Sequence, residues 1–226
     1  MRLLFISHIF PDGNDSWRGI ENVALLQSLA DRWEIRAVVL RPVRMWSRGE
    51  GWHPRASDVA FHPAFVSVPT LKILGARWNV RSAARALRKP LDRLRRDWRF
   101  DAVLCGSLLP GACAASRLAS EFQFRFVALS VQDEAEPRFA KSGVRKLVAS
   151  SLARAAGVVT DSSALGAILS QAGFRKERMT LITARESAAE APAHRPAAPS
   201  ARRAASAPHS RRPIAARLGR RPGKRH

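Results

Sequence analysis

The sequence has few cysteines, few acidic residues and no long apolar run. Cys105 and Cys113 are too few and too close together for the disulfide framework of a small secreted protein, and no Cys/His cluster has zinc-site spacing. We therefore expect a reducing compartment, no metal and no other cofactor.

No apolar run approaches the ~20 residues that span a bilayer, and segment 1–10 leads into a Pro-Asp-Gly turn, which predicts a buried strand rather than a signal peptide. We expect a cytoplasmic protein, soluble or peripheral on the cytoplasmic face of the inner membrane.

Acidic residues are outnumbered by basic ones throughout the chain. The 226 residues hold 39 Lys plus Arg against 18 Asp plus Glu, a net charge of +21. A charge of this sign favours anionic partners such as nucleic acid, phosphorylated ligands or an acidic membrane, and does not choose among them.

The composition changes near residue 183. Residues 184–226 hold 13 Ala, 6 Pro, 11 Lys plus Arg, two acidic residues and no aromatic residue. Such a segment cannot bury enough apolar surface to offset its ordering entropy, so we expect a disordered basic tail. The globular part, residues 1–183, retains a net charge of +12.

Short apolar runs alternate with helical periodicity along residues 1–183. The pattern predicts strands over residues 2–7, 34–40, 59–68 (broken by Pro63), 101–105, 124–130, 157–160 and 179–182. It predicts helices over 20–31, 77–99, 109–120, 144–156 and 162–172. Alternating β and α units imply parallel strands joined by right-handed crossovers. The predicted fold class is therefore α/β, a single Rossmann-like doubly wound parallel sheet.

Ligands of such sheets bind beyond the carboxyl ends of the strands. His8 follows the first predicted strand, and Gly19 precedes the first predicted helix. The glycine permits a close approach of backbone to backbone or to a ligand, and a helix amino terminus attracts anions. A loop glycine that only starts a helix fits the spacing equally well. The chain has neither a GxGxxG dinucleotide fingerprint nor a Walker lysine.

The order of these segments resembles glycosyltransferase family 4. The resemblance rests on MRLLFISHIFPDG, RGIENVALLQSLADRWEIRAVV, FDAVLCGSLLPGACAASRLA, FRFVALSVQDEAE and RAAGVVTDSSALGAILSQAGFRKERMTLI, and covers roughly residues 1–183. It suggests bacterial envelope or exopolysaccharide members of the family. It implies the amino-terminal, acceptor-side half of a GT-B fold, in which a second domain holds most of the nucleotide-sugar.

The resemblance also implies roles for particular residues. Gly19 would lie near the donor phosphates, with Arg18 standing where the family's G-G-x-E loop has its first glycine, and Glu21 keeping the acidic position. Ser107, Gln132 and Asp133 follow two further predicted strands and would contact the acceptor. Family histidines at these strand ends are replaced by Cys105 and Gln132, and neither side chain replaces an imidazole as a base. We expect Cys105 to be a buried core residue and Ser162, after Asp161, to cap a helix.

The donor half of the family pattern has no counterpart here. No two glutamates stand in an E-x7-E arrangement, and residues 184–226 are too few for a second sheet domain. A frameshift or truncation after about residue 183 is our preferred interpretation of the Ala/Arg/Pro-rich end. A genuine basic tail that binds nucleic acid or anionic lipid is the alternative.

The predicted helix over residues 77–99 is both apolar and basic. Leu87, Leu91, Leu94 and Trp98 share one face, and arginines that include Arg88, Arg93 and Arg96 cover much of the rest. We expect a core-packing crossover helix with a solvated basic face. The functional alternative is that these three arginines face an anionic membrane, with the apolar face partly inserted. Pro90 favours a kink or two shorter helices.

Three functions from different classes remain open. The favoured hypothesis is an acceptor-side glycosyltransferase domain, inactive alone, with a glycan or lipid-linked acceptor and a nucleotide-sugar bound only if a second domain is supplied. The alternative is a non-catalytic module that binds anionic lipid or a phosphorylated glycan. A nucleic-acid-binding protein is the third, and charge without interleaved aromatic residues carries no specific signal for it.

Overall fold

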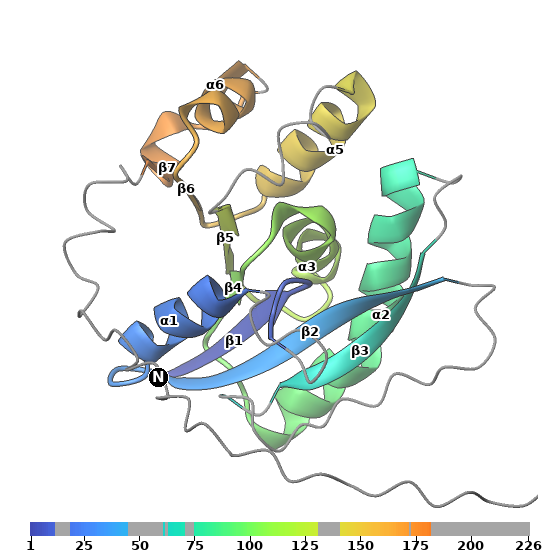
Figure 1. Cartoon of the computed structure of the whole chain (residues 1–226), viewed down its shortest axis with the longest axis vertical. Coiled ribbons are helices and arrows are strands. Elements are labelled where there is room, and N and C mark those ends of the chain that lie inside the picture. The colour runs from blue at the N-terminus through green and yellow to red at the C-terminus, as the bar shows by residue number, and fades with distance from the viewer. Residues whose placement is uncertain are drawn as a thin grey trace, which may run out of the picture. The chain divides into compact units, whose positions relative to one another are not determined.

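The computed structural model describes residues 1–11, 19–44, 61, 63–70, 75–130, 141–171 and 173–181, and their seven strands form one parallel sheet (Figure 1). The strands lie in the order β3, β2, β1, β4, β5, β6, β7. Every neighbouring pair is parallel. Their bounds are β1 Arg2–Ser7, β2 Glu34–Arg44, β3 Ala64–Thr70, β4 Ala102–Cys105, β5 Phe126–Ser130, β6 Gly157–Thr160 and β7 Met179–Leu181. The predicted doubly wound α/β fold is confirmed.

The helices alternate with the strands as the periodicity predicted. They are α1 Ile20–Leu29, α2 Gly75–Asp97, the π-helical turn η2 Leu108–Ala112, α3 Cys113–Leu118, α5 Ser142–Leu152, α6 Ser163–Gln171 and the 3-10 turn η4 Lys176–Arg178. At the start of α6 the Ser162 hydroxyl accepts a hydrogen bond from the Leu165 amide at 3.2 Å. The predicted role of Ser162 as a helix cap is confirmed.

The two faces of the sheet pack against different helices. On one face Phe5, Val39 and Leu26 of α1 share a small apolar cluster. On the other face the alternate strand residues, such as Leu4 and Ile6, join a larger core with residues of α2, α3, α5 and α6. Figure 1 shows α1 apart from the group formed by α2, α3 and α5. Both clusters follow from the period-two alternation of a pleated strand, which sends successive side chains to opposite faces.

The apolar face of α2 belongs to the core. Leu87 and Leu91 are fully buried, and Trp98, just beyond the helix, is 2% exposed. The expected core-packing helix with a basic outer face is confirmed, whereas the alternative in which this apolar face inserts into a membrane is wrong, because the sheet already covers it. Of the two expectations at Pro90, two shorter helices are wrong, since α2 runs through this residue as one helix.

β2 and β3 differ most from their predicted bounds, and β4 and β5 begin one and two residues later than predicted. β2 continues past residue 40 to Arg44, although Arg41 and Pro42 interrupt its apolar run. Beyond Val39 the strand has no register partner in β1 and pairs only with β3, where Pro42 lies opposite Val68. A proline that lacks an N–H is tolerated where one side of the strand is unpaired. β3 begins just after Pro63, and residues 59 and 60 of the predicted strand lie outside the described residues.

The described residues all fall within one compact unit, Met1–Glu190. The expected tail over residues 184–226 lies outside the described residues. None of the helices in the described ranges is long and apolar enough to cross a bilayer.

Candidate functional site

The sheet reverses its winding between β1 and β4. The chain runs outward from β1 through β2 to β3, then returns to place β4 on the opposite side of β1. Ile6 pairs with Cys105 at the carboxyl ends of these strands, and the Gly106 amide donates to the Ile6 carbonyl at 2.9 Å. In open parallel sheets the ligand crevice forms at such a switch point. The β1/β4 edge is therefore the candidate site.

Hydrogen bonds tie the loop after β1 to α1. The fully buried Ser7 hydroxyl accepts from the Ile9 amide at 3.0 Å. The Ile9 carbonyl in turn accepts from Nδ2 of Asn22, in the first turn of α1, at 2.8 Å. These two bonds hold the amino terminus of α1 at the switch point. Neither Ser7 nor Asn22 was a predicted site residue, and a polar residue in the first turn of the helix is the signal that could have pointed to Asn22.

Gly19 precedes α1 in a left-handed conformation, with φ 75° and ψ 30°. Its carbonyl accepts from the amides of Asn22 and Val23 at 3.1 and 3.4 Å. A Cβ at Gly19 would lie 2.8 Å from both the carbonyl carbon and the carbonyl oxygen of Ile9. The sequence predicted a close approach of Gly19 either to backbone or to a ligand. The structure shows a close approach to the backbone of Ile9.

Gly106 and Ser107 follow β4. A Cβ at Gly106 would lie 2.3 Å from the Phe5 ring and 3.2 Å from Oδ1 of Asn22, so only glycine fits between them. Ser107 is 7% exposed, and its carbonyl accepts from the Ala112 amide at 2.8 Å. Its Oγ is buried and has no hydrogen-bond partner among the residues that the structure describes.

Gly111 provides the space that the Ser107 hydroxyl occupies. A Cβ at Gly111 would lie only 2.7 Å from Ser107 Oγ. Packing between the end of β4 and η2 therefore holds the Ser107 hydroxyl where it makes no hydrogen bond. Burying an unpaired hydroxyl ordinarily lowers the stability of the folded protein. Such an orphaned group at the candidate edge calls for a functional explanation.

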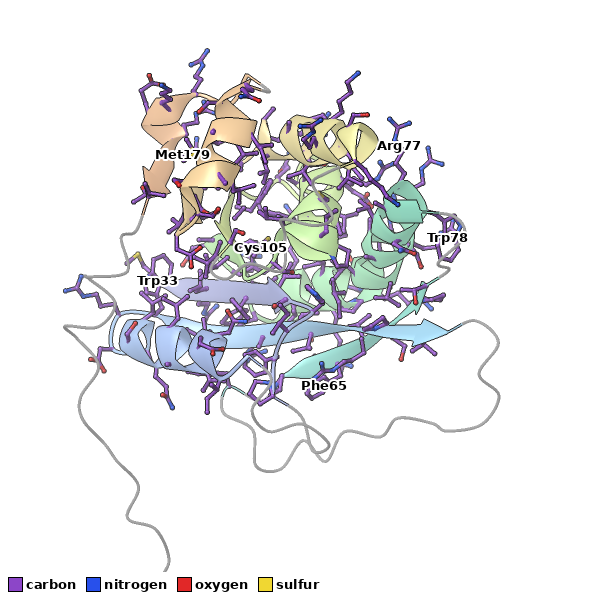
Figure 2. All side chains as sticks on the ribbon, turned by 45° about the horizontal axis from the view of Figure 1, so that its top comes forward. Trp33, Phe65, Arg77, Trp78, Cys105 and Met179 are labelled. Carbon is purple, nitrogen blue, oxygen red and sulfur yellow. The ribbon has the colours of Figure 1, made fainter. Side chains whose placement is uncertain are left out.

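Cys105 has the structural role expected of it. It is fully buried, and burial raises the pKa of its thiol, with Cys113 adding to the rise. Burial also raises the pKa of Cys113 to about 11. Figure 2 places Cys105 among the side chains inside the domain. Because the thiolate is the nucleophile, neither cysteine is suited to attack a substrate near neutral pH.

The other predicted site residues lie either on α2 or outside the described residues. Arg18, Gln132 and Asp133 lie outside the described residues. Arg88, Arg93 and Arg96 lie on the exposed side of α2, away from the β1/β4 edge, and each has a carboxylate partner: Glu121, Asp97 and Asp92 respectively. No group of three potential metal-ligating side chains gathers within the described ranges. The structure thus brings Gly19 and Ser107 to the same edge of the sheet.

Comparison with known proteins shows similarity at the level of fold. No family model matches the sequence, and no curated protein matches it. Among solved structures, a UDP-N-acetylglucosamine 2-epimerase is similar with a TM-score of 0.50 and 14% identity over 80% of this chain and 47% of that chain. Anabaena Alr3699/HepE in complex with UDP is similar with a TM-score of 0.47 and 17% identity over 81% of this chain and 44% of that chain. This chain spans less than half the length of either structure, and it shares the α/β fold of that part of the epimerase.

Proposed function

We propose that residues 1–183 are the acceptor-side domain of a glycosyltransferase of the family 4 type. The transfer would move a sugar from a nucleotide-sugar to a glycan or lipid-linked acceptor. The observation that carries the proposal is the β1/β4 switch point, where α1 begins beside Gly106 and Ser107. The shared fold with a protein named UDP-N-acetylglucosamine 2-epimerase supports a role with sugar nucleotides.

The proposed roles follow from the geometry of this edge. Gly19 opens a helix of ten residues whose amino terminus attracts anions, which suits a donor phosphate, and Arg18 would add a positive charge. Ser107 offers a hydroxyl that can donate one hydrogen bond and accept two, which suits a sugar hydroxyl. Gln132 and Asp133 are proposed to complete the acceptor site.

This chain alone is proposed to lack the transfer activity. Burial keeps the thiol of Cys105 neutral, so this cysteine at the β1/β4 edge does not supply a nucleophile. Transfer also requires donor and acceptor to be held near attack distance. In the proposed enzyme a second domain supplies most of the donor site, and the acceptor domain contributes the edge described above.

The first experiment asks where a sugar nucleotide contacts the chain. Amide resonances of ¹⁵N-labelled protein are followed during titration with UDP-glucose. We expect shifts at Gly19, Glu21, Gly106 and Ser107, and none at Arg93 and Arg96 on the outer side of α2. Shifts confined to α2, or no shifts at any concentration, would contradict the site.

The second experiment asks about activity. Radiolabelled UDP- and GDP-sugars are incubated with the chain and simple glycan acceptors, with and without a donor-side domain added in trans. We expect no transfer by the chain alone and recovery of some transfer in the mixture. Transfer at an ordinary enzymic rate by the chain alone would contradict the proposed inactivity.

A second candidate function is a non-catalytic module that binds anionic lipid or a phosphorylated glycan. The observation that favours it is the basic outer side of α2, on which Arg88, Arg93 and Arg96 all project into solvent. Each of these arginines already has an acidic neighbour, which weakens the local field. The acceptor-side role is therefore the better supported of the two.

A further inference from the structure

A groove between α2, α3 and α5 is lined by arginines of α2, of α3 and of the segment just after α5. It has a volume of about 580 Å³ and contains Arg81, Arg85 and Arg88 of α2, Arg117 of α3, and Arg154 just after α5. The three α2 residues stand at i, i+4 and i+7, so they form one stripe along the helix. Figure 2 shows side chains of α2 and α5 that end in nitrogen and point outward near the labelled Arg77. We name these five residues the arginine groove.

The arginine groove has no acidic residue in its lining. Arg88 forms an ion pair with Glu121 at 2.9 Å, outside this lining. The guanidinium groups of Arg81, Arg85, Arg117 and Arg154 have no hydrogen-bond or ion-pair partner among the residues that the structure describes. Placing five like charges around one groove raises the free energy of the folded protein unless a counter-charge binds there.

A second groove, next to the first, differs from it in having acidic residues among its basic ones. It shares Arg88 and is also lined by Arg95 and Arg96, but its lining includes the carboxylates of Asp92, Asp101 and Glu121. Arg96 pairs there with Asp92, and Arg95 donates to the Phe122 carbonyl at 2.7 Å. The two grooves therefore differ in their acidic residues, since three carboxylates line the second groove and none lines the arginine groove.

The serine hydroxyls on the floor of the arginine groove are not free to donate hydrogen bonds to a ligand. The Ser116 hydroxyl donates to the Ser151 carbonyl at 2.7 Å and joins α3 to α5. The hydroxyls of Ser150 and Ser151 both donate to the Leu147 carbonyl, at 3.0 and 2.8 Å. All three serine protons are thus used within the protein. The arginines are the remaining donors, and they project from helices that contact one another, α2 with α3 and α5, and α3 with α5.

We propose that the arginine groove binds a small molecule with at least two phosphate groups. A guanidinium donates two parallel hydrogen bonds to a phosphate, and five such groups around one groove match a diphosphate or a pair of phosphomonoesters better than a single anion. The volume lies within the range of small-molecule sites, roughly 300–1,000 Å³. The site is on the helical face of the domain and does not rest on the function proposed for the β1/β4 edge.

The test uses the full chain and inorganic pyrophosphate as the probe. Binding is measured by calorimetry at an ionic strength of about 0.15 M. We expect saturable binding, and a rise in Kd of about tenfold or more for Arg81→Gln with Arg85→Gln. The matched control is Arg32→Gln with Arg175→Gln, which removes the same charge from exposed positions outside the groove and should bind as the wild type does. Circular dichroism confirms that each variant is folded.

A third variant separates a built site from attraction by net charge. Arg117→Lys keeps the charge and loses the planar pair of donors, so we expect weaker pyrophosphate binding. Equal Kd values for the wild type, the groove variants and the control would overturn the proposal, as would the absence of saturable binding. Vesicles that contain phosphatidic acid identify the source of the phosphate. A lipid headgroup is indicated if pyrophosphate competes with vesicle binding and the groove variants no longer bind the vesicles. A soluble ligand is indicated if the groove variants and the control variant bind the vesicles equally.

Discussion

The indole nitrogen of Trp98 donates a hydrogen bond to Oε1 of Glu34 at 2.5 Å, which joins the end of α2 to the start of β2. The other carboxylate oxygen of Glu34 accepts from Nε of Arg2 at 3.1 Å. Arg36, two residues along β2, lies over the Trp98 ring at 4.8 Å. These contacts fix the amino-terminal edge of the sheet, opposite the candidate site.

The hydrogen bond from Trp98, followed by that from Arg2, lowers the pKa of the Glu34 carboxyl. Because the folded state prefers the ionised carboxyl more than the unfolded chain does, the stabilisation is present above the unfolded pKa of about 4.3 and is lost as the pH falls through the lower folded value. We expect Glu34→Gln to reduce the urea midpoint at pH 7 and to lose less stability than the wild type between pH 5 and pH 2. Glu121→Gln is the control, and an identical pH dependence of all three proteins would contradict this role of Glu34.

The close contact between Gly19 and Ile9 predicts opposite effects of two glycine substitutions. Gly19→Ala combines a positive φ with a Cβ 2.8 Å from backbone atoms, so we expect a loss of about 2 kcal/mol or more in the free energy of unfolding. Gly143→Ala lies within α5 and meets no atom within 4 Å, so we expect a gain of about 0.5–1 kcal/mol. Urea denaturation measures both, and equal effects would show that the contact at Ile9 does not constrain residue 19.

Two buried serines should also respond differently to removal of the hydroxyl. Ser107→Ala removes a group without a described partner, so we expect unchanged stability or a gain of up to about 1 kcal/mol. Ser116→Ala breaks the bond to the Ser151 carbonyl and should cost about 1–2 kcal/mol. Thermal unfolding gives both values. A large loss for Ser107→Ala would mean that its hydroxyl has a structural role and would weaken its assignment to the acceptor.

Any binding of the chain to anionic vesicles should depend on charge alone. Leu87, Leu91 and Trp98 are buried in the core, so this face of α2 cannot insert apolar side chains into a bilayer and add to the electrostatic attraction. We expect sedimentation with vesicles to disappear when ionic strength rises from about 0.1 M to about 1 M, as the Debye length falls from about 10 to about 3 Å. Binding that survives high salt would point to an apolar contact elsewhere in the chain.

The basic outer side of α2 can be tested in the same assay. Arg88→Glu, Arg93→Glu and Arg96→Glu together should weaken vesicle binding at low salt more than Arg32→Glu, Arg175→Glu and Arg178→Glu do. Equal weakening by the two triple variants would assign the attraction to net charge and exclude the α2 surface from it.

Local pattern was enough to predict the alternation of strands and helices and, from it, the parallel sheet. The bounds of β1 and β6 agree with the prediction because their apolar runs end at polar residues. The cap at Ser162 was predictable because it depends on chemistry within a few residues, and the burial of Cys105 because it ends an apolar run. The position of Gly19 before α1 was also visible in the sequence.

Only the tertiary structure decided what surrounds these residues. β2 extends through Arg41 and Pro42 because β3 supplies a partner and because the Arg41 guanidinium donates to the Phe10 carbonyl at 2.7 Å. Gly111 makes room for Ser107, and the arginine groove joins residues from three helices separated by up to 73 positions in the chain. Sequence periodicity assigns a residue to a face of its own element, whereas the neighbours of that face depend on how distant elements pack. The arrangement of charge and of orphaned polar groups therefore arises only when the fold is complete.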